Sequence, residues 1–131
     1  MLIEHRGRRP RVDASAYVAA TAVVCGDVTI EADTRVAFGA VIAAEGAPVV
    51  IGRQCIIREN AVIRSDTNNA VRIDKRAEVR VNGVVHVNSR LAEDAMVPIG
   101  WVAAGDPAEI LPPTEHEKIW AHIELRVAAC R

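Results

Sequence analysis

Residues 12–42 read VDASAYVAATAVVCGDVTIEADTRVAFGAVI, and every sixth residue of this stretch is valine or isoleucine. The spacing continues along the chain with two interruptions, which gives fourteen aliphatic positions: Val12, Val18, Val24, Ile30, Val36, Ile42, Ile51, Ile57, Ile63, Ile73, Val79, Val85, Leu91 and Val97. The residue four positions after each of these aliphatic residues is mostly small, as at Ala16, Ala22 and Ala40. Thr67, four positions after Ile63, is assigned to the same set. Such a period predicts a parallel β-helix, because each short strand points one large side chain inward and each corner admits a small one.

Three six-residue repeats make one coil, so the sequence predicts an all-β fold of about four to five coils. We expect a lead-in over residues 1–11, the β-helix over 12–105 and a C-terminal extension over 106–131. Thr114 and Glu117 form a capping box, and Ile119, Trp120 and Ile123 begin an apolar stripe with helical spacing. These features predict an α-helix at about residues 114–128.

The composition excludes several classes of protein. The 131 residues carry 16 basic and 17 acidic side chains, and alanine and valine together supply 41 residues. No segment approaches the ~18 uncharged apolar residues of a membrane span, and no apolar export signal follows the first charges, so we expect a cytoplasmic protein. The three cysteines are widely spaced and indicate neither a disulfide framework nor a cysteine-rich zinc site. The arginines of residues 6–11 lack interleaved aromatic residues, so nucleic acid is not an expected partner.

The two interruptions of the period predict loops at one corner of the β-helix. The aliphatic ladder advances by nine residues after Ile42 and by ten after Ile63, and both positions fall on the same face. The loops at residues 43–50 and 64–72 should therefore lie on adjacent coils, about 4.8 Å apart. They would bring together the following residues: Glu45, Arg64, Asp66, Thr67, Asn68, Asn69 and Arg72. This rim is either a ligand-binding site or a pair of solvated corners.

Stacking of the coils also predicts two pairs of outward side chains. Arg58 should lie beside Arg80, and Arg64 beside His86. The like charges need partners, which Glu59, Asp74 and Glu78 are close enough in sequence to supply. The arrangement is either a neutralised surface network or a groove for a carboxylate or phosphate between subunits.

The repeats resemble the hexapeptide-repeat superfamily, and most of all its γ-class carbonic-anhydrase-like branch. The resemblance lies in residues 24–30 (VCGDVTI), 49–52 (VVIG) and 97–110 (VPIGWVAAGDPAEI), and it covers roughly residues 10 to 125. It implies a left-handed β-helix, a homotrimer and a C-terminal helix packed along the coils. It also implies a zinc ion held by three histidines from two subunits, with an open position for water.

The zinc ligands of that family do not transfer to this sequence. Where relatives carry the first histidine, residues 57–63 (IRENAVI) are followed by Arg64, and Asn68 and Asn69 stand where others place it later. The next histidine pair would put Val81 five residues before His86, so at most one ligand remains. The chain is also shorter than its relatives by about two coils. We therefore expect no bound metal and no zinc-dependent CO2 hydration.

Three functions remain open, and whether the chain is an enzyme is undecided. The first is a metal-free enzyme or binder that acts on a small anion, with Glu59, Arg64, Asp66 and His86 as candidates for acid–base work and Glu45, Arg58, Asn68, Asn69, Arg72 and Arg80 for binding. The second is an acyltransferase that uses acyl-coenzyme A, although neither loop contains the histidine that such enzymes place there. The third is a non-catalytic trimeric scaffold. An active zinc carbonic anhydrase is the least favoured alternative.

Overall fold

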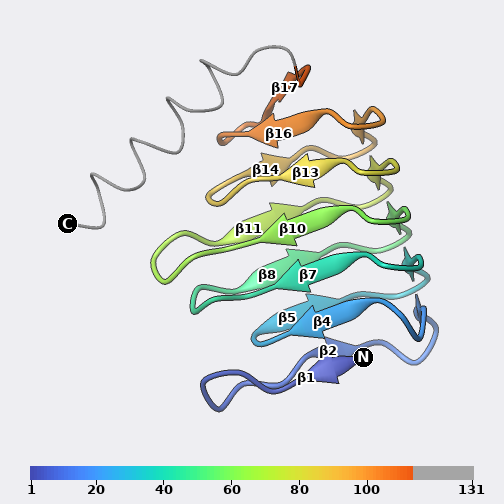
Figure 1. Cartoon of the computed structure of the whole chain (residues 1–131), viewed down its shortest axis with the longest axis vertical. Helices are drawn as coiled ribbons and strands as arrows, with labels where there is room; N and C mark the ends of the chain where they lie inside the picture. Colours follow the sequence, from blue (N-terminus) through green and yellow to red (C-terminus); the bar gives the residue numbers. More distant parts are fainter. Residues whose placement is uncertain (114–131) are drawn as a thin grey trace.

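The computed structural model describes residues 1–113, which wind into a left-handed parallel β-helix of about five turns (Figure 1). Seventeen short strands within these residues form three sheets, one on each face of a triangular prism. The predicted helix at 114–128 lies outside the described residues. Within the described part of the chain, no helix is long and apolar enough to span a membrane.

Each sheet collects one strand from every coil. The first sheet contains β1 (Leu2–Ile3), β4 (Val23–Cys25), β7 (Val41–Ala43), β10 (Val62–Arg64), β13 (Val84–Val85), β16 (Val102–Ala104) and β17 (Glu109–Leu111). The second sheet contains β2 (Arg11–Val12), β5 (Val28–Ile30), β8 (Val49–Ile51), β11 (Val71–Ile73) and β14 (Arg90–Leu91). The third sheet contains β3 (Tyr17–Val18), β6 (Arg35–Val36), β9 (Ile56–Ile57), β12 (Glu78–Val79) and β15 (Met96–Val97). The strands pair in parallel, except that β17 runs antiparallel to β16.

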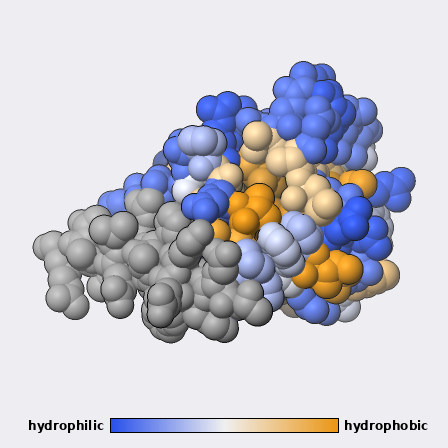
Figure 2. All heavy atoms as spheres, turned by 90° about the horizontal axis from the view of Figure 1, so that it is seen from above, coloured by the Kyte–Doolittle hydropathy of each residue, from blue (hydrophilic) through white to orange (hydrophobic). Residues whose placement is uncertain are grey.

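The predicted aliphatic ladder is confirmed as the core of the prism. Twelve of its fourteen residues are buried, while Val12 and Val18 are half-buried. Those two belong to β2 and β3, which are edge strands of their sheets, so one side of each lacks a neighbouring coil. The end of the β-helix that carries β16 and β17 shows apolar side chains at its centre and polar ones around them (Figure 2).

One position of the small-residue pattern is wrong. Thr67 was expected to point inward, but its side chain is exposed because it lies within the second insertion. Val71 takes the inward position instead, since it pairs with Val49, which in turn pairs with Val28. An insertion whose length is not a multiple of the repeat thus moves the inward position by four residues.

Two of the three corners are turned by stacked residues with positive φ. The corner after the second sheet uses Asp33, Gln54, Arg76 and Asp94, with φ between 56° and 61°. The corner after the third sheet uses Gly39, Asn60, Asn82 and Gly100, with φ between 58° and 72°. Asparagine, aspartate and glycine tolerate this conformation best, so six of the eight corner residues match the turn that each must make, while Gln54 and Arg76 do not.

A buried hydroxyl links two coils, and its removal tests how the corners are held. Thr34 Oγ1 donates to the carbonyl of Gly52 at 2.7 Å and accepts from the amide of Cys55 at 3.2 Å. We expect Thr34→Val to lower the free energy of unfolding by about 1–3 kcal/mol, because two buried backbone groups lose their partner. Urea denaturation measures this, with Thr29→Val as the control: this half-buried hydroxyl accepts from the exposed side chain of Arg11 and not from a buried backbone group, so its removal changes stability by less than about 0.5 kcal/mol. Equal losses in both variants would show that the buried bonds are not responsible.

Candidate functional site

The two insertions meet at one corner, as the period predicts. Val24 pairs with Ile42, Ile42 with Ile63 and Ile63 with Val85, so these residues form one column of the first sheet. The loops that follow β7 and β10 therefore leave the same edge on adjacent coils and project side by side in Figure 1. We call this region, formed by residues 43–48 and 64–70 with the neighbouring residues 5–8 and His86, the loop corner.

Hydrogen bonds join the two loops. The buried hydroxyl of Ser65 donates to the carbonyl of Ala47 at 2.6 Å and accepts from the amide of Glu45 at 3.2 Å. The amide of Ala47 donates to the carbonyl of Asp66 at 2.9 Å. These contacts fix the backbone of the loop corner, so its side chains project from a rigid base.

The carboxylate of Asp66 closes the second loop. Its Oδ1 accepts from the amide of Asn68 at 2.9 Å, the amide of Asn69 at 2.7 Å and the side-chain Nδ2 of Asn69 at 2.8 Å. Asp66 and Asn69 of the predicted group therefore form a turn motif, in which the aspartate organises the backbone that follows it, including the amide of Asn68.

Glu45 is the central acidic group of the loop corner. Its Oε1 lies 3.5 Å from Arg64 Nη2, and its Oε2 lies 3.8 Å from His5 Nε2. Both partners are partly exposed, with Arg64 at 57% of its side-chain surface. Long, exposed pairs of this kind stabilise a fold by only about 0–1 kcal/mol. They hold the guanidinium in place without occupying all of its five N–H donors.

The N-terminal residues join the loop corner, which the sequence analysis missed. Strand β1 pairs with β4, and His5 and Arg8 then exchange backbone hydrogen bonds of 2.9 and 3.1 Å. Between them Arg6 and Gly7 have φ of 53° and 74°, as a tight hairpin turn requires. A Cβ added to Gly46 would lie 3.3 Å from Arg6 Nη1, so this second guanidinium also lies beside the loops. The Arg6-Gly7 dipeptide after two apolar residues was the signal that could have predicted this turn.

His86 lies one coil from Arg64, as predicted. The pairing of Ile63 with Val85 places Arg64 and His86 in register at the ends of β10 and β13, and Ala43 lies in register on the other side. The backbone amide of His86 donates to the carbonyl of Ala103 at 3.0 Å. The loop corner thus brings the side chains of Arg64 and His5 to the carboxylate of Glu45, with Arg6 beside Gly46 and His86 one coil from Arg64 in register.

Other predicted site residues lie on different faces. Arg58 and Arg80 follow adjacent strands of the third sheet, and each pairs at 3.1 Å with its own carboxylate, Glu59 and Glu78 respectively. Hydrogen bonds from its own backbone amide and from Arg58 lower the pKa of the Glu59 carboxyl, so this group is an ionised partner for an arginine.

Arg72 lies on the second sheet, where Asp74 pairs with it at 2.9 Å and with Arg90 at 3.1 Å. The predicted neutralised network thus agrees with the contacts of Arg58 and Arg80, which pair with Glu59 and Glu78, while Asp74 pairs with Arg72 and Arg90 instead. Glu45, Arg64 and His86 therefore lie together at the loop corner, whereas Arg58 and Arg80 lie outside it.

The donors of the loop corner do not fit a zinc ion bound by three histidines. Within residues 1–113, no group of three or more His, Cys, Asp or Glu side chains is arranged to hold a metal ion. Arg64 stands where the resemblance places the first zinc histidine, and a guanidinium has no lone pair to offer a metal. The position instead presents hydrogen-bond donors with positive charge.

Comparisons with known proteins agree with this fold. No protein-family model matches the sequence. A carbonic anhydrase of Geobacillus kaustophilus is 30% identical over 110 residues, which are 84% of this chain and 59% of that protein. Among solved structures, a GDP-perosamine N-acetyltransferase of Caulobacter crescentus, in complex with CoA and GDP-perosamine, covers 77% of this chain and 52% of its own, with a TM-score of 0.53 and 21% identity. A predicted acetyltransferase of Bacillus cereus covers 95% of this chain and 91% of its own, with a TM-score of 0.50 and 17% identity.

The fold and the six-residue period define a left-handed β-helix of the hexapeptide-repeat type. Together with the similarity to that carbonic anhydrase, they support a place for the chain in the hexapeptide-repeat superfamily, near its carbonic-anhydrase-like branch. The chain spans 59% of the length of that relative. The acetyltransferase structures share its fold.

Proposed function

We propose that this chain is a homotrimeric, metal-free relative of the γ-class carbonic anhydrases that binds a small anion at the loop corner. The observation that carries the proposal is the position of Arg64. It ends β10 between Ala43 and His86, in place of a metal ligand, and its nearest contact with Glu45 is a long one, Nη2 to Oε1 at 3.5 Å. The guanidinium of Arg64 thus supplies a positive charge in place of a metal ion.

The chemistry of the loop corner favours a carboxylate or bicarbonate. A guanidinium binds a planar oxyanion through two parallel N–H···O bonds, which gives both charge and geometry. Arg6 from the hairpin lies beside Gly46, and His5 Nε2 lies 3.8 Å from Glu45 at the same corner. The three arginines of the loop corner, Arg6, Arg8 and Arg64, outnumber its two carboxylates, Glu45 and Asp66, so a small anion is attracted to it.

Substitution of Arg64 tests the proposed function. We expect Arg64→Gln to weaken the binding of bicarbonate and acetate by roughly tenfold, and Arg64→Lys by less, because lysine keeps the charge but loses the two parallel bonds. Isothermal titration at low ionic strength measures the affinities. Arg58→Gln is the matched control, since Arg58 lies in the same coil, six residues earlier, and pairs with Glu59 on another face.

Two results would refute the proposal. Unchanged affinity in Arg64→Gln would show that the anion binds elsewhere. Equal weakening in the Arg64 and Arg58 variants would show that binding reflects the overall charge of the protein and not a site at the loop corner.

A further inference from the structure

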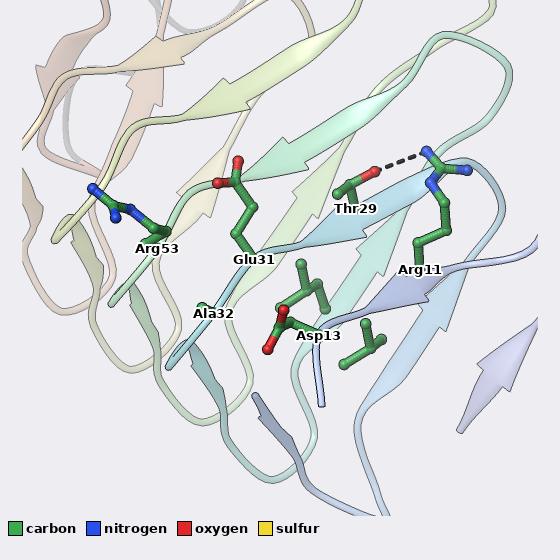
Figure 3. A pocket seen from close by; sticks show the side chains of 8 residues that line it. Arg11, Asp13, Thr29, Glu31, Ala32 and Arg53 are labelled. Atoms are coloured by element: carbon green, nitrogen blue, oxygen red, sulfur yellow. Dashed lines mark hydrogen bonds between the residues drawn. The ribbon is translucent and has the colours of Figure 1, made fainter. Parts of the chain in front are cut away.

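A second group of polar side chains lies on the outer face of the second sheet, away from the loops. Two adjoining pockets occur there, with volumes of about 520 and 320 Å³. The first lies over β2 and β5, the second extends toward β11 and β14, and Glu31 and Arg53 line both. We call the two pockets together the sheet groove. In Figure 3, Arg11 reaches Thr29 at one end of the first pocket, and Glu31 and Arg53 stand at the other.

The sheet groove arises from two columns of outward residues. The column before the aliphatic ladder has cations at both ends of the axis, because it runs in register from Arg11 through Thr29 and Val50 to Arg72 and Arg90. The column after the ladder is acidic, with Asp13, Glu31 and Asp74. Each coil repeats the same outward positions, so the groove runs along the axis of the β-helix.

Gly52 interrupts the acidic column at the middle coil. A Cβ at this position would lie 2.8 Å from the amide nitrogen of Lys75 and 3.0 Å from the carbonyl oxygen of Ile73, so no side chain fits there. The absence of a carboxylate between Glu31 and Asp74 leaves open floor in the second pocket, which Gly52 lines. Arg53 follows immediately and lines the same pocket.

Most cations of the sheet groove already have carboxylate partners. Arg11 donates to Asp27 at 2.7 Å, both Arg72 and Arg90 pair with Asp74, and Lys75 lies 3.6 Å from Glu93. Arg53 differs, because its guanidinium makes no hydrogen bond or ion pair with another side chain in residues 1–113. The carboxylate of Glu31 likewise has no such partner within these residues. An available cation and an available hydrogen-bond acceptor therefore stand together where the two pockets meet.

The lining also limits the chemistry of the ligand. Neither pocket contains an aromatic side chain, so a nucleobase would find no surface on which to stack. Thr29, Glu31 and Asp13 offer hydroxyl and carboxylate groups, which suit ligand hydroxyls. The volumes are in the range of sites for small ligands.

We propose that the sheet groove binds a small hydroxylated oxyanion, a sugar phosphate or a sugar carboxylate. The oxyanion lies on the guanidinium of Arg53, and ligand hydroxyls donate to Glu31 in the adjoining pocket. The two sources of the oxyanion, phosphate and carboxylate, share this recognition. The proposal is independent of anion binding at Arg64, which lies at the loop corner.

Titrations of the full chain with glucose 6-phosphate, gluconate and inorganic phosphate test this site. Isothermal titration gives affinities, and amide shifts in ¹⁵N-correlated spectra locate the ligand. We expect Arg53→Gln to weaken glucose 6-phosphate or gluconate by at least roughly tenfold. Arg35→Gln is the matched control, because Arg35 is another exposed arginine without a side-chain partner in the described residues, on the third sheet. Neither Arg35→Gln nor Arg64→Gln should change binding in the sheet groove.

Glu31→Gln separates the two parts of the ligand. It should weaken the hydroxylated ligands, because a neutral amide accepts hydroxyl hydrogen bonds less strongly than a carboxylate. It should strengthen inorganic phosphate, because a repelling charge is removed. If Glu31→Gln bound both the hydroxylated ligands and inorganic phosphate more tightly than the unsubstituted protein does, the proposed role of Glu31 would be overturned.

Other outcomes overturn the site as a whole. The site is refuted if none of the three ligands gives a heat of binding or an amide shift near Arg53. Equal weakening in the Arg53 and Arg35 variants would also refute it. Loss of binding only in Arg64→Gln would assign the anion to the loop corner, and would support the proposed function while it refutes the sheet groove.

Discussion

Replacement of Ile57 by alanine is expected to lower the free energy of unfolding by about 2–5 kcal/mol, whereas replacement of its neighbour Ile56 changes it by less than about 1 kcal/mol. The two isoleucines form strand β9 and differ only in the face on which they lie. Ile57 is fully buried in the aliphatic column, and Ile56 is 39% exposed on the outer face. Ile57 also pairs with Val36 and Val79 above and below, so the cavity left by alanine affects three coils.

Denaturation by urea, followed by far-ultraviolet circular dichroism at one protein concentration, compares the two variants. A fixed concentration is needed because an oligomer is more stable at higher concentration. A larger loss in Ile56→Ala than in Ile57→Ala would contradict the assignment of inward and outward positions, and with it the whole alignment of the repeats.

Replacement of Gly26 by alanine should have the second large effect, a loss of about 2–4 kcal/mol. Gly26 follows β4 at the loop corner with φ of 83°, and an added Cβ would lie 2.5 Å from the carbonyl oxygen of Ala44. The carbonyl cannot move freely, because Ala44 precedes Glu45 in a loop whose backbone is tied to the loop above through Ser65. The variant should therefore also weaken anion binding at Arg64.

Gly100→Ala serves as the control for Gly26→Ala. Gly100 has φ of 72°, but an added Cβ would find no heavy atom within 4 Å. Its loss should be limited to the backbone cost of about 1–2 kcal/mol. Thermal unfolding of both variants separates the cost of φ from the cost of the close approach. If both lost the same stability, the contact between Gly26 and Ala44 would have no energetic role.

The sequence predicted the core well because a β-helix repeats one physical constraint. Each of the positions from Val24 to Val97 must fit the same prism, so the period is visible without any alignment of relatives. Residues outside the period were harder to place. Strand β1 has only two residues, and the turn at Arg6 and Gly7 depends on pairing with β4, which lies more than twenty residues away.

The candidate site was predicted in part for the same reason. Three six-residue repeats complete one coil, so counting the repeats assigns each residue to a face of the prism. This count predicted that Glu45, Arg64 and His86 lie at one corner. Arg58 precedes Arg64 by one repeat and therefore lies on the preceding face, where it pairs with Glu59.

The sheet groove could not be predicted, because its open floor depends on the missing side chain of Gly52 and on which arginines already have partners. Such pairings are a property of the folded chain and leave no mark in the spacing of the residues.

The zinc content of the untagged protein, grown with added zinc and purified without chelator, tests the central proposal most directly. With Arg64 in the position where the resemblance places a histidine ligand, we predict far less than one zinc per chain by elemental analysis of the folded protein. About one zinc per chain, together with CO2 hydration that a chelator abolishes, would contradict the account. The loop corner would then be a metal site and not the proposed anion site at Arg64.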